Sequence, residues 1–81
     1  MYHIYILQSQ KDNKYYIGST SNVQSRLNYH NSGRQRSTCH RVPFKLVYTE
    51  EFTSNTDALK REKQIKSYKG GEAFKRLISG V

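Results

Sequence analysis

Hydrophobic and polar positions alternate along the first 20 residues in two segments. Residues 3–9 (HIYILQS) and 14–20 (KYYIGST) are rich in β-branched and aromatic side chains, which predicts two strands. The polar segment between them contains Asp12-Asn13, a pair that tolerates left-handed backbone, so a hairpin turn is expected there. Neighbouring side chains of a strand point to opposite faces of its sheet. Tyr15 and Tyr16 therefore cannot both face the core.

The length of this turn decides which tyrosines share a face. If the loop is only Asp12-Asn13, Lys11 pairs with Lys14, and Tyr5 lies on the same face as positions 16, 18 and 20. A three-residue loop would instead place Tyr5 on the face of position 15. We expect the two-residue turn, with Tyr5 and Tyr16 on one face.

The segment 21–33 has the spacing of a helix. Ser21 followed by Gln24 is a capping-box pattern, and Gly33 is a suitable terminator. Three side chains between them recur at i, i+4 and i+7 and predict the buried face: Val23, Leu27 and His30.

The remainder of the chain predicts a loop, a strand and two helices. Residues 34–43 are basic and polar, and 44–52 (FKLVYTEEF) alternate as a third strand, with three side chains on one face: Phe44, Leu46 and Tyr48. Ser54 and Asp57 are placed to cap a helix over 55–69, which stops at Gly70-Gly71. The last helix, 72–78, should turn three apolar side chains inward: Phe74, Leu77 and Ile78.

These elements predict an α+β fold in the order ββαβαα. One three-stranded antiparallel sheet flanked by helices is the natural arrangement, with a single domain over residues 1–81. A chain of 81 residues is long enough for one modest core.

The charge of the chain changes the functional picture. Fourteen Lys and Arg against six Asp and Glu give a net charge of +8. A domain this basic favours an anionic partner, nucleic acid above all, although a solvated basic surface would have the same composition. The single cysteine, Cys39, excludes an internal disulfide, and no apolar run is long enough for a membrane span. With no signal-peptide pattern at its start, the chain is expected in the cytoplasm, without a membrane partner.

Glu62 interrupts the apolar stripe of the helix predicted over 55–69. Ala58, Glu62 and Ile65 recur at i, i+4 and i+7, so the carboxylate would face the sheet. A buried charge is costly unless it is paired or binds a metal. The competing interpretation, which periodicity alone favours, places Glu62 at the margin of the stripe, paired with Lys66.

Arg26 and His30 are four residues apart and therefore neighbours on one helix surface. Taken singly, Arg26 could be a solvated helix residue, His30 a residue at the core margin and Tyr5 a packed strand aromatic. Together with Tyr16 and a core-facing Glu62 in a basic domain, they predict a site for a phosphodiester.

Hydrolysis of a phosphodiester requires a deprotonated water, stabilisation of extra negative charge on phosphorus and help for the leaving oxygen. A carboxylate can hold one divalent ion, Mg²⁺ or Mn²⁺, which supplies part of this help. An arginine offers a planar set of donors to phosphate oxygens, and a tyrosine of lowered pKa can act as a general base. All three residue types are present in the predicted site.

The stretches HIY at 3–5 and YIG at 16–18, followed by Arg26, His30 and Glu62, resemble the GIY-YIG nuclease family. The likeness is greatest to small stand-alone bacterial members, which are similar to the N-terminal nuclease domain of the excinuclease component that incises damaged DNA. The resemblance implies a metal-dependent endonuclease that hydrolyses phosphodiester bonds in DNA, in repair or in the processing of branched or damaged DNA. DNA is expected as the partner ahead of RNA.

The resemblance also implies a role for each site residue. Tyr5 would be the general base, Tyr16 would position the water or phosphate, and Arg26 would stabilise charge on the pentavalent phosphorus. His30 would assist proton transfer or contact the phosphate, and Glu62 would be the sole protein ligand of one Mg²⁺ or Mn²⁺ ion.

Further positions follow from the same resemblance. Tyr15 would be a core residue, and Gly18 would allow close approach of the backbone. Six residues are candidates for contact with nucleic acid: Gly18, Ser19, Arg34, Arg36, Arg41 and Lys66.

The sequence departs from the family pattern at several points. His3 replaces the first glycine of the family motif, Ser19 stands where excision-repair relatives often have lysine, and no asparagine follows Glu62. We expect no appended DNA-recognition domain, and therefore low sequence specificity.

Two other functions remain open from the residues alone. A non-catalytic nucleic-acid module would hold phosphates with the loop 34–41 and the basic segment 59–69 (LKREKQIKSYK). A zinc site from His30, Cys39 and His40 is disfavoured, because the spacing matches no common structural zinc pattern.

Overall fold

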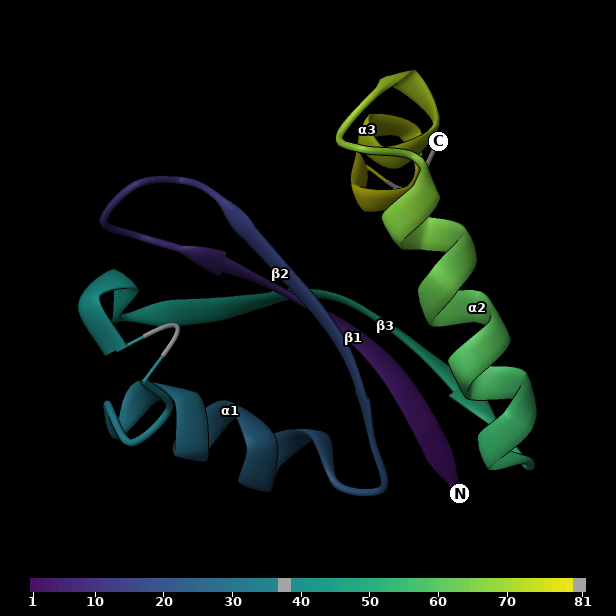
Figure 1. The fold of residues 1–81 in the computed structure, drawn as a ribbon, viewed down its shortest axis with the longest axis horizontal. Coiled ribbons are helices and arrows are strands. Elements are labelled where there is room, and N and C mark those ends of the chain that lie inside the picture. Colours follow the sequence, from purple (N-terminus) through teal and green to yellow (C-terminus); the bar gives the residue numbers. More distant parts are fainter. Residues whose placement is uncertain (37–38, 80–81) are drawn as a thin grey trace.

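The computed structural model of the protein describes residues 1–36 and 39–79. A three-stranded antiparallel sheet in the order β2-β1-β3 is flanked by helices (Figure 1). The elements are β1 (Tyr2–Ser9), β2 (Tyr15–Thr20), α1 (Val23–Asn31), the short 3-10 turn η1 (Cys39–Arg41), β3 (Phe44–Phe52), α2 (Asn55–Ser67) and α3 (Glu72–Ser79). The order ββαβαα and the fold class are those the sequence predicts.

The β1–β2 hairpin has a longer loop than predicted. Tyr5 lies opposite Gly18 and Leu7 opposite Tyr16. The backbone N–H of Ser9 donates to the carbonyl of Lys14 at 2.9 Å, which leaves a four-residue loop over 10–13 instead of the two-residue turn. The register therefore differs from the predicted one by two residues. Because side chains alternate with a period of two, Tyr5 and Tyr16 still share a face, as predicted.

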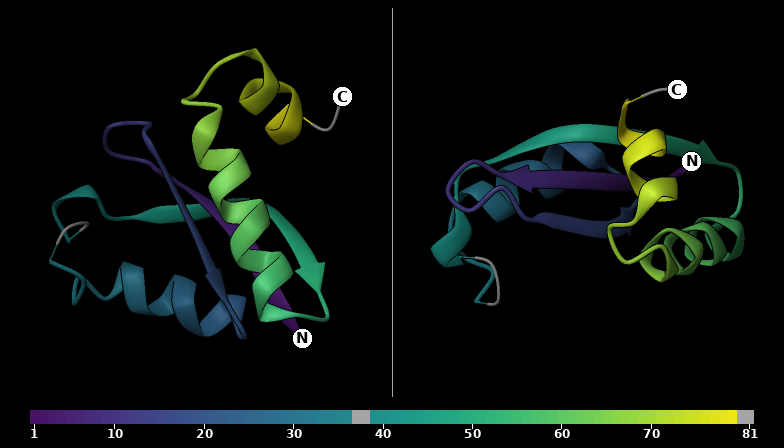
Figure 2. Two further views of the ribbon diagram at one scale, coloured as in Figure 1. Left: turned by 45° about the vertical axis from the view of Figure 1, so that its right-hand side comes forward. Right: turned by 90° about the horizontal axis from the view of Figure 1, so that it is seen from above.

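The two faces of the sheet bury separate groups of side chains. Ile4 and Ile6 pack with Ala58 and Ile65 of α2 and with Phe74 of α3. On the other face, the buried residues Tyr5, Leu7 and Phe44 have as half-buried neighbours Tyr16, Val23, Leu27 and Val42. Figure 2 shows α2 and α3 together along one side of the sheet, with α1 lying apart from them. The single strand β1 thus supplies apolar residues to both cores.

Strand β3 contains an irregularity that the alternation did not predict. Ile6 pairs with Tyr48 but Leu7 pairs with Leu46, so Val47 is an extra residue in a bulge. Phe44 and Leu46 consequently share the face of Leu7, whereas Tyr48 packs on the opposite side with Ile6. The predicted common face for Phe44, Leu46 and Tyr48 is wrong, because the bulge reverses the alternation between the second and third of them.

Helix α1 is capped one residue later than predicted. Asn22, not Ser21, is the N-cap, and its side chain accepts the N–H of Ser25 at 3.0 Å. At the other end Gly33 has φ of +76°, consistent with its predicted role as terminator. The Asn31 amide joins this end to β3, because it donates to the carbonyl of Phe44 at 3.1 Å and accepts the N–H of Phe44 at 2.6 Å.

Helix α2 is held to β3 by a pair of charges. Both carboxylate oxygens of Glu50 accept from Arg61, at 3.0 Å from Nε and 2.9 Å from a terminal nitrogen, and the hydroxyl of Tyr48 donates to the same carboxylate. Ser54 occupies the N-cap position without a side-chain capping bond. The Arg61–Glu50 pair therefore fixes the helix next to the position of Glu62.

Two further expectations concern the loop and the membrane. The basic loop 34–43 contains η1, and its residues 37–38 lie outside the described residues. Within 1–36 and 39–79, no helix is both long and apolar enough to cross a bilayer.

Candidate active site

The hydroxyl of Tyr5 lies at the centre of the predicted site. Tyr5 is only 2% exposed, and its hydroxyl oxygen is 3.4 Å from Nε2 of His30, a distance that permits a weak hydrogen bond. The ring of Tyr16 stacks beside that of Tyr5, with centroids 6.3 Å apart, and lies 4.6 Å from the ring of His30. Strand β1, strand β2 and helix α1 each contribute one of these three rings.

The surroundings of Tyr5 favour its protonated form. Burial raises the pKa of Tyr5 to about 12, with a further increase from the electrostatic effect of Tyr16 and a smaller one from the carboxylate of Glu62. Arg26 acts in the opposite direction, because its positive charge and hydrogen bonding favour the phenolate. Residues from α1, β2 and α2 therefore all act electrostatically on one phenol.

His30 faces inward from α1 and is 1% exposed. Besides the two tyrosines, its ring contacts those of Tyr29 and Phe44, with centroids 5.9 Å away in each case. Burial lowers the pKa of His30, and the nearby charge of Arg26 lowers it further. Neutral imidazole is thus the favoured form, and one of its nitrogens is then an acceptor.

Arg26 projects from α1 at the exposed margin of this group. Its guanidinium carbon lies 5.4 Å from the centre of the Tyr29 ring, three residues further along the helix. Such a cation–aromatic contact limits the orientations available to the guanidinium. Arg26 therefore combines solvent access with influence on the pKa values of Tyr5 and His30.

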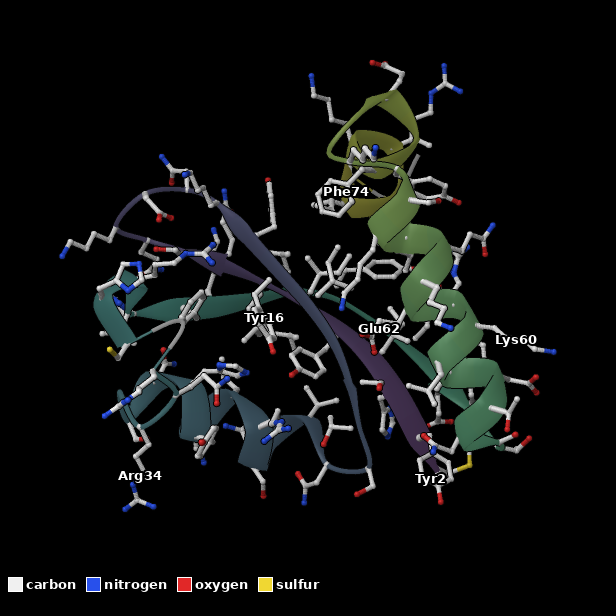
Figure 3. The ribbon with its side chains drawn as sticks, viewed as in Figure 1. Tyr2, Tyr16, Arg34, Lys60, Glu62 and Phe74 are labelled. Atoms are coloured by element: carbon white, nitrogen blue, oxygen red, sulfur yellow. The ribbon has the colours of Figure 1, made fainter. Side chains whose placement is uncertain are left out.

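Glu62 occupies the margin of the buried face of α2. Ala58 and Ile65 are fully buried, whereas the Glu62 side chain is 17% exposed and accepts from Lys66 Nζ at 2.7 Å. Figure 3 shows Tyr16 and Glu62 both lying toward the middle of the molecule, on either side of β2. The carboxylate is mostly shielded from solvent. Each of the two predicted interpretations is therefore correct in part, because Glu62 lies on the side of α2 toward the sheet (Figure 3) and also pairs with Lys66.

The backbone of Gly18 lies directly against the phenol of Tyr5. A Cβ atom at this position would lie 2.6 Å from the Tyr5 hydroxyl oxygen and 2.8 Å from the ring carbon that bears it. No side chain fits between this backbone and the phenol. The close approach expected at Gly18 is therefore between its backbone and Tyr5.

The candidate nucleic-acid contacts differ in how accessible they are. Arg34 and Arg36 are exposed, and Arg34 extends away from the molecule (Figure 3). Arg41 is instead half-buried: its guanidinium pairs with Asp12 at 3.3 Å, donates to the carbonyl of Tyr15 and lies over the ring of Phe44. These contacts of Arg41 connect the β1–β2 hairpin to the loop 34–43. Lys66, the last of the candidates, pairs with Glu62.

Two tyrosine positions correct or extend the sequence analysis. Tyr15 points away from Tyr16 as predicted, but it is 40% exposed and packs edge-on against Phe74 with centroids 5.0 Å apart, so the prediction of a core residue is wrong. Tyr29, which the sequence analysis did not select, supports Arg26. Its spacing of three residues from Arg26 was the available signal.

The donor set fits a metal held largely by its substrate. Within the described residues, no group of three or more His, Cys, Asp or Glu side chains could hold an ion, which also leaves the alternative zinc site without support. Glu62 offers one carboxylate, and Mg²⁺ commonly binds through one or two carboxylates together with phosphate oxygens and waters. The residues present are compatible with that mode of binding.

The sheet supplies two phenols, α1 a neutral imidazole and a guanidinium, and α2 one carboxylate, a set of groups suited to hydrolysis of a phosphate ester. The GIY-YIG catalytic domain matches residues 1–74. The chain therefore belongs to the GIY-YIG family, a family of nucleases.

Individual relatives are small proteins of similar length. The chain is 38% identical over 77 residues to a UPF0213 protein of Staphylococcus haemolyticus, covering 94% of this chain and 93% of that one. It is 40% identical over 67 residues to a UPF0213 protein of Halobacterium salinarum, covering 82% and 86%. The solution NMR structure of a UPF0213 protein from Bacillus halodurans is similar at a TM-score of 0.50 and 33% identity, over 91% of this chain and 92% of that one.

Proposed function

We propose that this protein is a divalent-metal-dependent endonuclease that hydrolyses phosphodiester bonds in DNA, acting in the cytoplasm on branched or damaged structures. The observation that carries the proposal is the environment of the Tyr5 hydroxyl. The hydroxyl is buried, lies 3.4 Å from Nε2 of His30 and belongs to a ring that stacks beside Tyr16. The charges of Arg26 and Glu62 both affect its pKa. Titratable groups with perturbed pKa values and specific charged neighbours are common at functional sites, which supports the proposal.

Tyr5 and His30 would move the proton of the attacking water together. With its pKa raised to about 12, Tyr5 stays protonated at pH 7, so it is a poor base by itself. His30 is neutral and close enough to accept the phenol proton as Tyr5 takes one from water. The pair would thus serve as a base without a standing negative charge in the site.

Arg26 and Tyr16 would act on the phosphate. Arg26 is exposed in the free protein, which suits a group that must reach the equatorial oxygens of a bound diester. Its contact with Tyr29 would keep the guanidinium oriented before the substrate arrives. The half-buried Tyr16 is placed to orient the water or a phosphate oxygen.

Glu62 would hold a single Mg²⁺ or Mn²⁺ ion, which when bound would neutralise charge on the phosphate and the leaving oxygen. In the free protein Lys66 neutralises this carboxylate. Exchange of the ammonium for a divalent ion would therefore avoid leaving Glu62 as an unpaired, largely shielded charge.

Nicking of supercoiled plasmid and of branched oligonucleotides, with Mg²⁺ or Mn²⁺, tests this proposal. Glu62→Gln should lower the rate at least about a hundredfold, and Tyr5→Phe should lower it about 10²–10⁴-fold. Glu51→Gln is the matched control, because it makes the same chemical change at an exposed carboxylate of β3. Equal nicking by wild type and Glu62→Gln would refute the assignment.

A non-catalytic nucleic-acid module is the second candidate, favoured by the net charge of +8 alone. This function requires binding that weakens with salt and is unaffected by Tyr5→Phe, Arg26→Gln and Glu62→Gln. Binding of that kind by a wild-type protein that cleaves neither DNA nor RNA with either metal would select the module over the nuclease.

A further inference from the structure

Two open hollows adjoin each other along the solvent side of α1. They have volumes of about 370 and 330 Å³, and both are lined by Ser25 and Tyr29. One reaches Arg26 and the segment 20–22, and the other reaches Asn28, Ser32 and Arg34. Because they share two lining residues they are adjacent, and together they are called here the α1 groove.

The lining of the α1 groove has the chemistry of a phosphate-binding surface. It consists of hydroxyl and amide side chains, one tyrosine and two guanidinium groups, without a carboxylate. The sequence around it is equally one-sided, since no acidic residue occurs between Asp12 and Glu50. That interval contains six basic residues: Lys14, Arg26, Arg34, Arg36, Arg41 and Lys45. Such a surface repels no part of a polyanion and offers donors along its length.

The groove begins at the candidate active site. Arg26 lines it and also influences the pKa values of Tyr5 and His30. From Ser25 to Ser32 the helix advances about 10 Å, which corresponds to about three nucleotides at the rise of a duplex strand. Arg34 stands at the far end and extends outward (Figure 3).

We infer that the α1 groove binds the backbone of the DNA strand that adjoins the scissile phosphodiester, over about three phosphates. This inference rests on the proposed function, because that function places the scissile phosphate at Arg26. Hydroxyl, amide and guanidinium donors recognise phosphate oxygens without reading bases. The groove therefore fixes the direction of the strand but gives no sequence preference.

Binding without divalent metal tests the inference separately from cleavage. The probe is a 5′-fluorescein 15-mer oligonucleotide followed by anisotropy. Asn28→Asp and Ser25→Asp each place a negative charge in the groove and should weaken binding at least about fivefold. Thr56→Asp on α2 is the matched control, since it changes the net charge equally on an exposed residue outside the groove and should have a much smaller effect.

Loss of binding through misfolding can be recognised from the melting temperature of each variant. Ser25→Asp puts an acidic residue in the first turn of α1, where it interacts favourably with the helix dipole, so its melting temperature should not fall. Arg34→Gln should reduce the slope of log K against log salt by about one. The inference would be overturned if Thr56→Asp weakened oligonucleotide binding as much as the groove variants do. It would also be overturned if neither Ser25→Asp nor Asn28→Asp weakened binding.

The cleavage assay then separates the two proposals. A wild-type protein that nicks no substrate, while the groove variants still lose binding selectively, would refute the nuclease and leave the groove. Metal-dependent nicking that Glu62→Gln abolishes, with binding unchanged in both groove variants, would refute the groove and leave the nuclease.

Discussion

The side chain of Tyr5 lies against the backbone of Gly18 so closely that a Cβ atom at position 18 would be 2.6 Å from the Tyr5 hydroxyl oxygen. The backbone of Gly18 is not in the left-handed region, so the requirement for glycine here is one of space and not of conformation. The smallest possible side chain on β2 would thus displace the central group of the site.

Gly18→Ala should therefore abolish the proposed nuclease activity nearly as completely as Tyr5→Phe. Because Tyr5 is buried, its ring cannot swing aside freely, and we expect the free energy of unfolding to fall by about 1–3 kcal/mol. Nicking rates and urea unfolding of the single and double variants check this. If both changes act through the phenol, adding Gly18→Ala to Tyr5→Phe will cost little further activity. Additive losses would contradict the mechanism.

The stability of the protein should decrease as the pH falls through the range in which histidine normally titrates. Burial, aided by the charge of Arg26, lowers the pKa of His30 in the folded state, so the unfolded chain binds the proton more readily. The stabilisation is complete above the unfolded pKa of about 6.5 and is lost toward the lower folded value. Urea unfolding between pH 8 and pH 5 measures the slope, which should flatten in His30→Gln. An unchanged slope in that variant would assign the effect to other groups.

The Arg61–Glu50 pair should make a measurable contribution to stability. Glu50 accepts two hydrogen bonds from one guanidinium, and both side chains are about a quarter exposed. Allowing for this exposure, Glu50→Gln should lower the free energy of unfolding by about 1–2 kcal/mol. Glu51→Gln, one residue away and exposed, is the control. A change in Glu50→Gln that is no larger than that in Glu51→Gln would argue against a role for the pair in holding α2.

The same pair predicts a second pH effect at lower pH. Burial alone would raise the pKa of Glu50, but the hydrogen bonds from Arg61 and Tyr48 outweigh it and hold that pKa below its usual value. The stabilisation is present above pH 4.5, the ordinary value, and is lost as the pH falls through the folded value. Acid unfolding of Glu50→Gln should consequently be less steep below pH 4.5 than that of the wild type.

Removal of Lys66 should make the site easier to saturate with metal. Its ammonium lies 2.7 Å from a Glu62 oxygen and would compete with the proposed divalent ion for that carboxylate. The lysine is half-exposed, so the pair is weak, and Lys66→Met should lower the half-saturating Mg²⁺ concentration by about two- to fivefold. Lys63→Met on the same helix is the control. A higher Mg²⁺ requirement in Lys66→Met would indicate that the lysine assists binding instead.

The parts of the fold that follow from local patterns were predictable. Element order, the third strand and the shared face of Tyr5 and Tyr16 depend on alternation and spacing, which survive an error of two residues in the hairpin register. The bulge at Val47 was not predictable, because it is a property of the pairing between β1 and β3, which the alternation within residues 44–52 does not contain. The exposure of Tyr15 likewise depends on how much of it α3 covers, a tertiary property.

Spacing and family resemblance selected the members of the candidate site, whose catalytic roles stay predictions, but they did not indicate its protonation states. In the structure Arg26 and Glu62 affect the pKa of Tyr5, and Arg26 also affects that of His30. Sequence patterns do not show how deeply a side chain is buried. They therefore could not indicate that the phenol of Tyr5 would be a weaker acid than an ordinary tyrosine. They also could not reveal that the loop cation Arg41 is already paired with Asp12.

The four-residue loop over 10–13 has a consequence for variation among related chains. Residues added within this loop leave the pairs from Ser9–Lys14 onward unchanged, so Tyr16 keeps its place beside His30. A slip of one residue in the pairing itself would instead turn Tyr16 to the opposite face of the sheet. Natural and engineered length changes at this tip should therefore be tolerated wherever Leu7 stays opposite Tyr16.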